Sequence, residues 1–412
     1  MVRARLVLLH RWLGLATLAF LILASATGSI LAWHDELDAW VAPELLRTPA
    51  TSVALAPMVP AVLRDIVVAA YPQGRVLAIP LARHPGKTVA FPVWLTDPGS
   101  ASPVLLEVFI DPATGLIQGD RRWGDPTDGL KNLLPVIHRL HTSLLAGSTG
   151  EWVLGVVALL WTLDCFIGAF LTFPARAAKR RAGGPAKSWL ARWRAAWALR
   201  VSSRGYKLGF DLHRASGLWL WVLLLGMAWS SVAFNLPAVY RPVMGVWLDQ
   251  QPDLRRALRQ SASGSKTSMD WEQALTQGRR HMATMTEEKQ LGIVGEHWLA
   301  FDPRANLYRY TVRSTQDIRD KTGSTHVFFD AADGKLRGVQ LPTGGVAGDT
   351  ATLWLTSLHM AALWGWPLQL AVSILGIVVV VLSVTGWIIW RRKRQARTTR
   401  PVHAAPRAQA AR

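Results

Sequence analysis

Four long runs of apolar residues, separated by mixed polar sequence, dominate the chain. Each run has about 20 residues, the length that an α-helix needs to cross a hydrocarbon core of about 30 Å. We therefore expect transmembrane helices at residues 13–33, 152–173, 217–236 and 367–390. The first run follows a basic start and also fits a cleaved signal peptide. Cleavage would leave three spans and put two basic segments on opposite sides, so we interpret the run as an uncleaved anchor.

The two stretches between the first and second runs and between the third and fourth runs have similar patterns. Each predicts a helix followed by strands with alternating apolar positions. The helices are expected at 62–71 and 271–284, and the strands at 89–95, 105–110, 296–301, 308–313 and 326–329. Both stretches contain a turn that Asp opens and Gly closes, Asp111 to Gly115 and Asp330 to Gly334, which is hairpin chemistry.

The similarity of the two halves extends into the apolar runs. A Leu-His pair opens the first and third runs, and another Leu-His pair precedes the second and fourth. We interpret the chain as two copies of one unit, each made of a span, an outer domain and a span, as in other duplicated membrane proteins. The predicted fold class is an internally duplicated α-helical bundle of four transmembrane helices with two α+β periplasmic domains.

This interpretation divides the whole chain into eight segments. They are a cytoplasmic N-terminus with the first span (1–33), a first periplasmic domain (34–151), the second span (152–173), a basic cytoplasmic loop (174–216), the third span (217–236), a second periplasmic domain (237–366), the fourth span (367–390) and a basic cytoplasmic tail (391–412).

The net charge of +19 is concentrated beside the apolar runs. Residues 176–214 hold eleven Lys and Arg against one acid, and eight more Lys and Arg follow Trp390 with no acid. This positive-inside pattern places both termini on the cytoplasmic side of the membrane and argues against nucleic-acid binding. The basic loop carries tryptophans at intervals of four, which favours contact with anionic lipid over docking of an electron donor (Trp189, Trp193 and Trp197).

Histidines recur at the ends of the predicted spans. His10 and His213 fall at the cytoplasmic side, whereas His141 and His359 fall at the outer side. The repeat therefore predicts an inner pair and an outer pair, and two facing imidazoles can supply both axial ligands of a haem iron. A single histidine at a helix end is more often a cap or a carbonyl partner, but four at duplicated positions favour haem. Zinc fits less well, because two histidines underfill its tetrahedral site.

Three further residues are candidates with open roles. His34 and His138 lie on the outer side and are alternative ligands of the outer haem, or partners of its propionates, of a substrate or of a proton. Asp164 lies inside the second span, where an acid is costly and a functional candidate. It fits a proton site or a polar partner such as Asn235 or Ser231, and equally a packing hydrogen bond between helices.

Other cofactor chemistry has no signature in the sequence. The one cysteine, Cys165, excludes a two-cysteine attachment of c-type haem, so the two predicted haems are b-type with bis-His ligation. No Gly-rich nucleotide motif follows a strand, and we expect no flavin or NAD site. Electrons would come from a separate donor, either a cytoplasmic reductase or quinol. No catalytic residue is assigned.

Several short motifs recur along the chain beside both Asp-x-x-x-Gly hairpins: Leu9-His10-Arg11-Trp12-Leu13-Gly14, His34-Asp35-Glu36-Leu37-Asp38, Leu140-His141, and Leu382-Ser383-Val384-Thr385-Gly386-Trp387 before Arg391-Arg392. Together these stretches resemble the PepSY-associated transmembrane family, which includes iron-regulated membrane proteins and inner-membrane ferric-siderophore reductases. The resemblance covers nearly the whole chain before the tail. It implies a bacterial inner-membrane protein with four helices, two periplasmic PepSY-like domains and, for the reductase members, a two-haem path from cytoplasm to periplasm.

The leading hypothesis is a two-haem transmembrane electron-transfer protein that reduces a ferric chelate, such as a siderophore complex, on the periplasmic side during iron uptake. Two alternatives stay open. One is a non-enzymatic envelope protein whose PepSY domains bind or regulate a partner. The other is a haem electron carrier that serves another periplasmic oxidoreductase.

Overall fold

The computed structural model describes residues 2–96, 103–175, 188–202, 204–252, 254–260 and 268–398. These residues form two compact units. Unit 1 comprises Met1–Ala26, Gly155–Trp229 and Ile374–Arg412, and unit 2 comprises Thr27–Leu154 and Ser230–Ser373. Parts of the predicted basic loop and basic tail, residues 176–187 and 399–412, lie outside the described residues.

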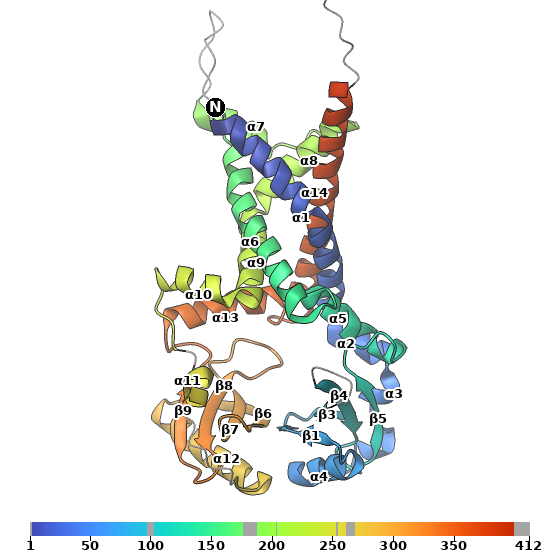
Figure 1. Cartoon of the computed structure of the whole chain (residues 1–412), viewed down its shortest axis with the longest axis vertical. Coiled ribbons are helices and arrows are strands. Elements are labelled where there is room, and N and C mark those ends of the chain that lie inside the picture. The colour runs from blue at the N-terminus through green and yellow to red at the C-terminus, as the bar shows by residue number, and fades with distance from the viewer. Residues whose placement is uncertain are drawn as a thin grey trace, which may run out of the picture. The chain divides into compact units, whose positions relative to one another are not determined.

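Long apolar helices supply most of unit 1. Three of them are long and apolar enough to cross a membrane, namely α1 (Val2–Leu31), α6 (Gly147–Thr172) and α14 (Trp366–Thr398) (Figure 1). In α14 the candidate membrane span is Trp366–Ala396. Helix α14 contains the whole predicted span 367–390. Helices α1 and α6 begin before the predicted spans 13–33 and 152–173 and end two residues and one residue before their predicted ends. A buried cluster packs the helices together: Cys165, Leu224, Leu375 and Val379.

The third predicted span, residues 217–236, is not one straight helix. It covers the end of α8 (Tyr206–Trp219) and all of α9 (Trp221–Asn235), whose axes differ by 71°. Leu220 between them has φ −103° and ψ 11°, outside the α-helical region, which produces the bend. The described residues therefore contain three helices that are long and apolar enough to span a membrane, or four if the bent pair is one span.

Tryptophans on either side of the break are held by different elements. Trp219 donates its indole N–H to the carbonyl of Trp197 at 3.0 Å, at the end of α7 (Trp189–Trp197). Trp221 donates to the carbonyl of Cys165 in α6 at 2.8 Å. These two bonds hold the helix on both sides of its bend.

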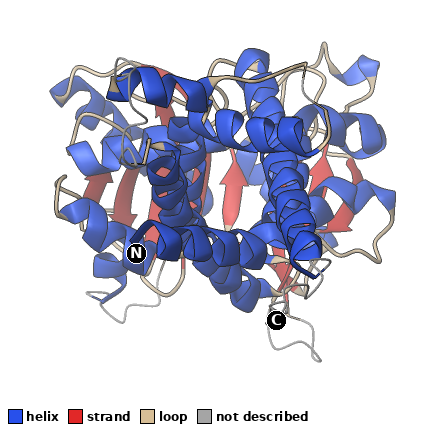
Figure 2. Ribbon diagram, turned by 90° about the horizontal axis from the view of Figure 1, so that it is seen from above, coloured by secondary structure: helices blue, strands red, loops and turns tan. Residues whose placement is uncertain are grey.

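Two antiparallel sheets form the centre of unit 2, and among the described residues all strands, red in Figure 2, belong to this unit. The first sheet has the order β1 (Gly74–Val76), β3 (Val89–Leu95), β4 (Val104–Ile110), β5 (Ile117–Arg122). The second has the order β2 (Ala78–Pro80), β6 (Ile293–Asp302), β7 (Leu307–Ser314), β8 (Thr325–Asp330), β9 (Leu336–Gln340). Helix α4 (Pro60–Ala70) packs on the first sheet and α12 (Trp271–Glu288) on the second.

Strand β2 joins the two halves of the sequence. It follows β1 in the chain but pairs with β6, so that Ile79 lies opposite Leu299. A single buried core continues through both sheets and includes Leu63 and Phe91 from the first half and Tyr308 and Phe329 from the second. The two predicted periplasmic domains thus share a sheet and a core, which the sequence patterns do not predict.

The two predicted hairpin turns have the same geometry. Gly115 and Gly334 have φ values of 73° and 72°, a left-handed conformation that glycine adopts at little cost. In each turn the glycine N–H donates to the carbonyl of the opening aspartate, Asp111 or Asp330, at 2.9 and 3.0 Å. Each turn follows a register shift one to two residues earlier in its strand.

Shorter helices complete unit 2: α2 (His34–Val41), α3 (Pro43–Leu46), α5 (Leu133–Ser143), α10 (Pro237–Gly245), α11 (Leu254–Gln260) and α13 (Ala347–His359). Asp38 of α2 accepts two hydrogen bonds of 2.9 Å from the buried guanidinium of Arg121 in β5, which also bonds Glu107 at 2.8 Å. This network fixes α2 against the first sheet. Helices α5 and α13 carry His141 and His359 in their last turns.

Candidate functional site

Within unit 1, His10 of α1 and His213 of α8 lie opposite each other and form what we call the inner pair. Their ring centres are 6.1 Å apart and their planes differ by 56°. Both side chains are half-buried. The sequence predicts this pairing from the repeat alone, although 203 residues separate the two histidines.

Each histidine of the inner pair makes a hydrogen bond through Nδ1. His10 Nδ1 lies 2.8 Å from a carboxylate oxygen of Asp164 in α6, and His213 Nδ1 lies 2.9 Å from the backbone carbonyl of Leu382 in α14. A carbonyl oxygen can only accept, so Nδ1 of His213 carries the proton. In a neutral ring the Nε2 atom then keeps its lone pair, which is the state in which histidine binds metals.

Glycines allow neighbouring helices to approach both rings. A Cβ atom added to Gly386 would lie 3.1 Å from Cε1 of His213, and one added to Gly168 would lie 3.5 Å from Cε1 of His10. The first distance is shorter than an ordinary contact between carbon atoms, about 3.5–4.0 Å, whereas the second equals it. The space beside His213 is therefore the tighter of the two.

Within unit 2, His141 and His359 form the outer pair. Their ring centres are 6.4 Å apart and their planes differ by 63°. Nδ1 of His141 lies 3.0 Å from the hydroxyl of Thr27, and Nδ1 of His359 lies 2.6 Å from the hydroxyl of Ser230. A Cβ atom on Gly28 would lie 3.0 Å from Cε1 of His141, so the close packing of a glycine recurs here.

The two alternative histidines have other surroundings. His138 packs against the ring of Trp123, with 5.3 Å between centres, and its buried Nδ1 has no hydrogen-bond partner among the described residues. Burial, with His34 and His141 nearby, lowers the pKa of His138 to about 4. His34 contacts the carboxylate of Asp35 at 3.2 Å. The structure thus places His141, rather than His138, opposite His359.

A charged cluster next to His34 is absent from the sequence prediction. Lys321 lies 2.7 Å from a carboxylate oxygen of Asp35 and 3.4 Å from one of Glu36. The hydrogen bond from His34, and then the ammonium of Lys321, hold the pKa of Asp35 far below its usual range. No sequence signal identifies Lys321, because it comes from a loop 286 residues away from Asp35.

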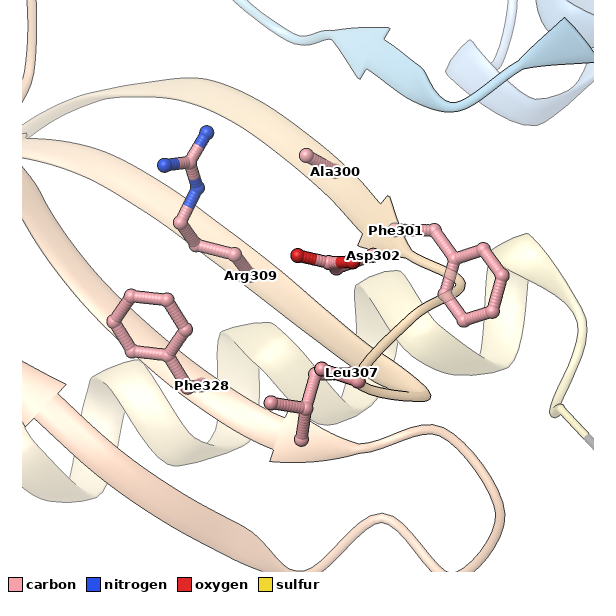
Figure 3. Close-up of a pocket in the computed structure, with 7 residues that line it drawn as sticks. Ala300, Phe301, Asp302, Leu307, Arg309 and Phe328 are labelled. Atoms are coloured by element: carbon pink, nitrogen blue, oxygen red, sulfur yellow. The ribbon is translucent and has the colours of Figure 1, made fainter. Parts of the chain in front are cut away.

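No three His, Cys, Asp or Glu side chains among the described residues are close enough together to bind a metal ion alone. A small cavity lies elsewhere in unit 2, on the second sheet (Figure 3). It has a volume of about 30 Å³ and is lined by residues that include Asp302, Arg309 and Phe328. Ligand pockets have about 300–1,000 Å³, so this cavity does not qualify as a chelate site.

Comparison with known proteins identifies the family. Residues 7–393 match the sequence profile of the PepSY-associated TM region. The chain belongs to this family. The match confirms the resemblance predicted from the motifs, and no curated protein matches the chain significantly. Together with the apolar helices, membership makes this PepSY-associated protein a multi-pass membrane protein with an α+β part.

Proposed function

We propose that this PepSY-associated protein carries electrons across the membrane through two b-type haems and reduces a ferric chelate, such as a siderophore complex, at the periplasmic side. The observation that supports this most is the separation of the histidine rings, 6.1 Å in the inner pair and 6.4 Å in the outer pair. Two imidazoles this close together would be able to hold one haem iron jointly, so each pair would supply the ligands of one b-type haem.

The surroundings of the rings fit the same assignment. Each of the four histidines makes a hydrogen bond through Nδ1, which fixes the ring orientation and favours Nε2 as the metal ligand. His10 and His213 would hold the inner haem, and His141 and His359 the outer one. A bound haem would supply reversible one-electron chemistry, while the protein sets ligand basicity, burial and access.

A duplication of the chain supports equivalent sites in the two halves. Thr27 and Ser230, the partners of the outer pair, are 203 residues apart, as are His10 and His213. A second constant spacing, of 218 residues, separates the two histidines of the outer pair. The same spacing separates the corresponding groups that contact the two histidines of the inner pair. The residue pairs are His141 with His359, Asp164 with Leu382, and Gly168 with Gly386.

The basic segments support an inner-membrane protein with both termini in the cytoplasm and anionic lipid against its inner face. Arg3 contributes to this arrangement, because it donates to the carbonyls of Leu171 and Phe173 at 2.7 and 2.9 Å. A cation at the C-terminal end of α6 is favoured by the helix dipole. The inner pair then faces the cytoplasmic donor, and the outer pair faces the oxidant.

The reaction needs no covalent step. One electron converts one Fe(III) to Fe(II), which hard oxygen ligands hold less tightly, so iron is released. A quinol donor would give up two electrons and two protons and serve two ferric ions. A cytoplasmic reductase would supply the same electrons without quinone.

A reoxidation experiment tests the function. Protein from haem-supplied cells is reduced chemically without oxygen and then mixed with a ferric siderophore, with the gallium(III) complex of the same siderophore as a redox-inert control. We expect the haem spectrum to reoxidise with iron and to stay reduced with gallium. Replacement of His359 by alanine should abolish the fast reoxidation.

A haem electron carrier for another periplasmic oxidoreductase is the second candidate. It needs the same two histidine pairs but no chelate site, and the cavity of about 30 Å³ on the second sheet is too small to serve as one. Reduced protein that ignores every ferric chelate but is reoxidised by periplasmic extract would support this candidate over the first.

A further inference from the structure

Asp164 breaks the equivalence of the two halves at the inner pair. It is an acid inside α6, a membrane-crossing helix, with only 13% of its side chain exposed. Its carboxylate contacts Nδ1 of His10, whereas at the equivalent position the neutral backbone carbonyl of Leu382 contacts Nδ1 of His213. An acid is expensive in this setting, and a neutral carbonyl performs the same orienting role 218 residues later.

At the outer pair, the Nδ1 atoms lie next to hydroxyl groups. Thr27 and Ser230 present hydroxyl groups to His141 and His359. Of the four Nδ1 contacts described here, three are therefore made to neutral oxygens and one to a carboxylate. Orientation alone does not explain the carboxylate, because all four contacts orient a ring.

We propose, on the basis of the two-haem function, that Asp164 is a positioning residue that lowers the reduction potential of the inner haem below that of the outer haem. A carboxylate at Nδ1 increases the basicity of the ligating imidazole. It also adds a negative charge that stabilises the ferric form, which carries one more positive charge than the ferrous form. Both effects are stronger in the low dielectric of a membrane interior.

The direction of electron flow follows from this difference. An electron passes spontaneously from the site of lower potential to the site of higher potential. The inner pair would thus release electrons toward the outer pair, from the cytoplasmic donor to the periplasmic oxidant. The carboxylate of Asp164 thus sets the direction of electron transfer between two sites that the duplication would otherwise make alike.

The test is a potentiometric titration of the full-length protein in its wild-type and Asp164→Asn forms, with haem counted per chain. A His213→Ala variant identifies which of the two redox waves belongs to the inner haem. We expect Asp164→Asn to raise the inner wave by at least a tenfold change in equilibrium constant, about 59 mV for one electron. The outer wave should not move.

Two further variants control for charge and for folding. Asp164→Glu keeps the carboxylate and should keep a low inner potential. Asp164→Ser provides a neutral hydroxyl, as Ser230 does at the outer pair, and gives the same readout if Asp164→Asn does not retain haem. Ser230→Ala, which removes a neutral partner, should shift the outer wave by less than tenfold.

The electron paramagnetic resonance spectrum of the oxidised inner haem should change with the inner wave in Asp164→Asn, because the ligand field of His10 weakens. Two retained haems with unchanged potentials in both neutral variants would overturn the inference and leave the two-haem function intact. A wild-type protein without haem would instead remove the proposed function.

Discussion

Gly28 offers a direct test of how tightly the outer pair is packed. A Cβ atom at this position would lie 3.0 Å from Cε1 of His141 and 3.6 Å from its Nδ1. An ordinary carbon–carbon contact is about 3.5–4.0 Å, so Gly28→Ala must push the ring away by about 0.5 Å. A metal site tolerates about 0.5 Å of misplacement before it weakens. Alanine should therefore loosen the outer haem, and leucine should exclude it.

A loss of haem in Gly28→Ala would come from the contact with His141 and not from a weaker helix. Alanine in a helix is favoured over glycine by about 0.5–1 kcal/mol, so Gly28→Ala would stabilise α1 if the ring did not interfere. The matched controls are Gly14→Ala, whose Cβ would meet nothing within 4 Å, and Gly168→Ala, whose Cβ would lie at 3.5 Å from the ring of His10. Both should keep two haems per chain.

The assay is haem per chain together with the reduced-minus-oxidised spectrum of purified protein from haem-supplied cells. We expect Gly28→Ala to lose part of the outer haem or to shift its bands, and Gly28→Leu to retain only the inner haem. Gly28→Leu with two haems and an unchanged spectrum would refute the packing argument.

Three further predictions concern stability. Asp38→Ala leaves the buried guanidinium of Arg121 with Glu107 as its remaining carboxylate partner and should cost about 1–3 kcal/mol, measurable as a lower unfolding temperature; an unchanged temperature would contradict the network. Burial lowers the pKa of His326 to about 3. The unfolded chain therefore binds more protons between pH 6.5 and 3, and unfolding free energy should fall by up to about 1.4 kcal/mol per pH unit on acidification. His326→Gln should reduce the difference between melting at pH 7 and at pH 5, and an equal pH dependence in both proteins would count against it. Alanine at Gly115 or Gly334 should cost about 1 kcal/mol through its positive φ, and more at Gly115, where the Cβ would also meet a side chain at 2.8 Å; equal melting of both variants would show that this contact yields easily.

Local patterns predict those elements whose signal lies within a few residues. The strand expected at 89–95 matches β3, because its alternate residues Val89, Phe91 and Val93 are buried as the period of two requires. The apolar runs also identify the long helices, since length and hydropathy alone determine whether a helix can span a membrane. The bend at Leu220 has no such local signal, because partners in other helices hold its two sides.

Contacts between residues that lie far apart in the chain cannot be predicted from local sequence patterns. Strand β2 is three residues long and ends in proline, and its partner β6 lies more than 200 residues later. The histidine pairs are an exception, because equivalent positions of the predicted repeat both carry histidine. The contact of Asp164 with His10 could not be predicted in this way. Asn235, one of the partners expected for Asp164, instead donates to the carbonyl of Ser231 at 3.0 Å.

The measurement that tests the central claim most directly is a dithionite-reduced minus oxidised spectrum of the purified full-length protein, with haem quantified per chain. The ring separations of both pairs predict b-type bands from close to two haems per chain, and loss of about one haem when His213 is replaced by alanine. A blank spectrum from cells well supplied with haem would contradict the account. The four histidines would then be structural residues at helix ends, and a binding role of the PepSY domains would become the leading function.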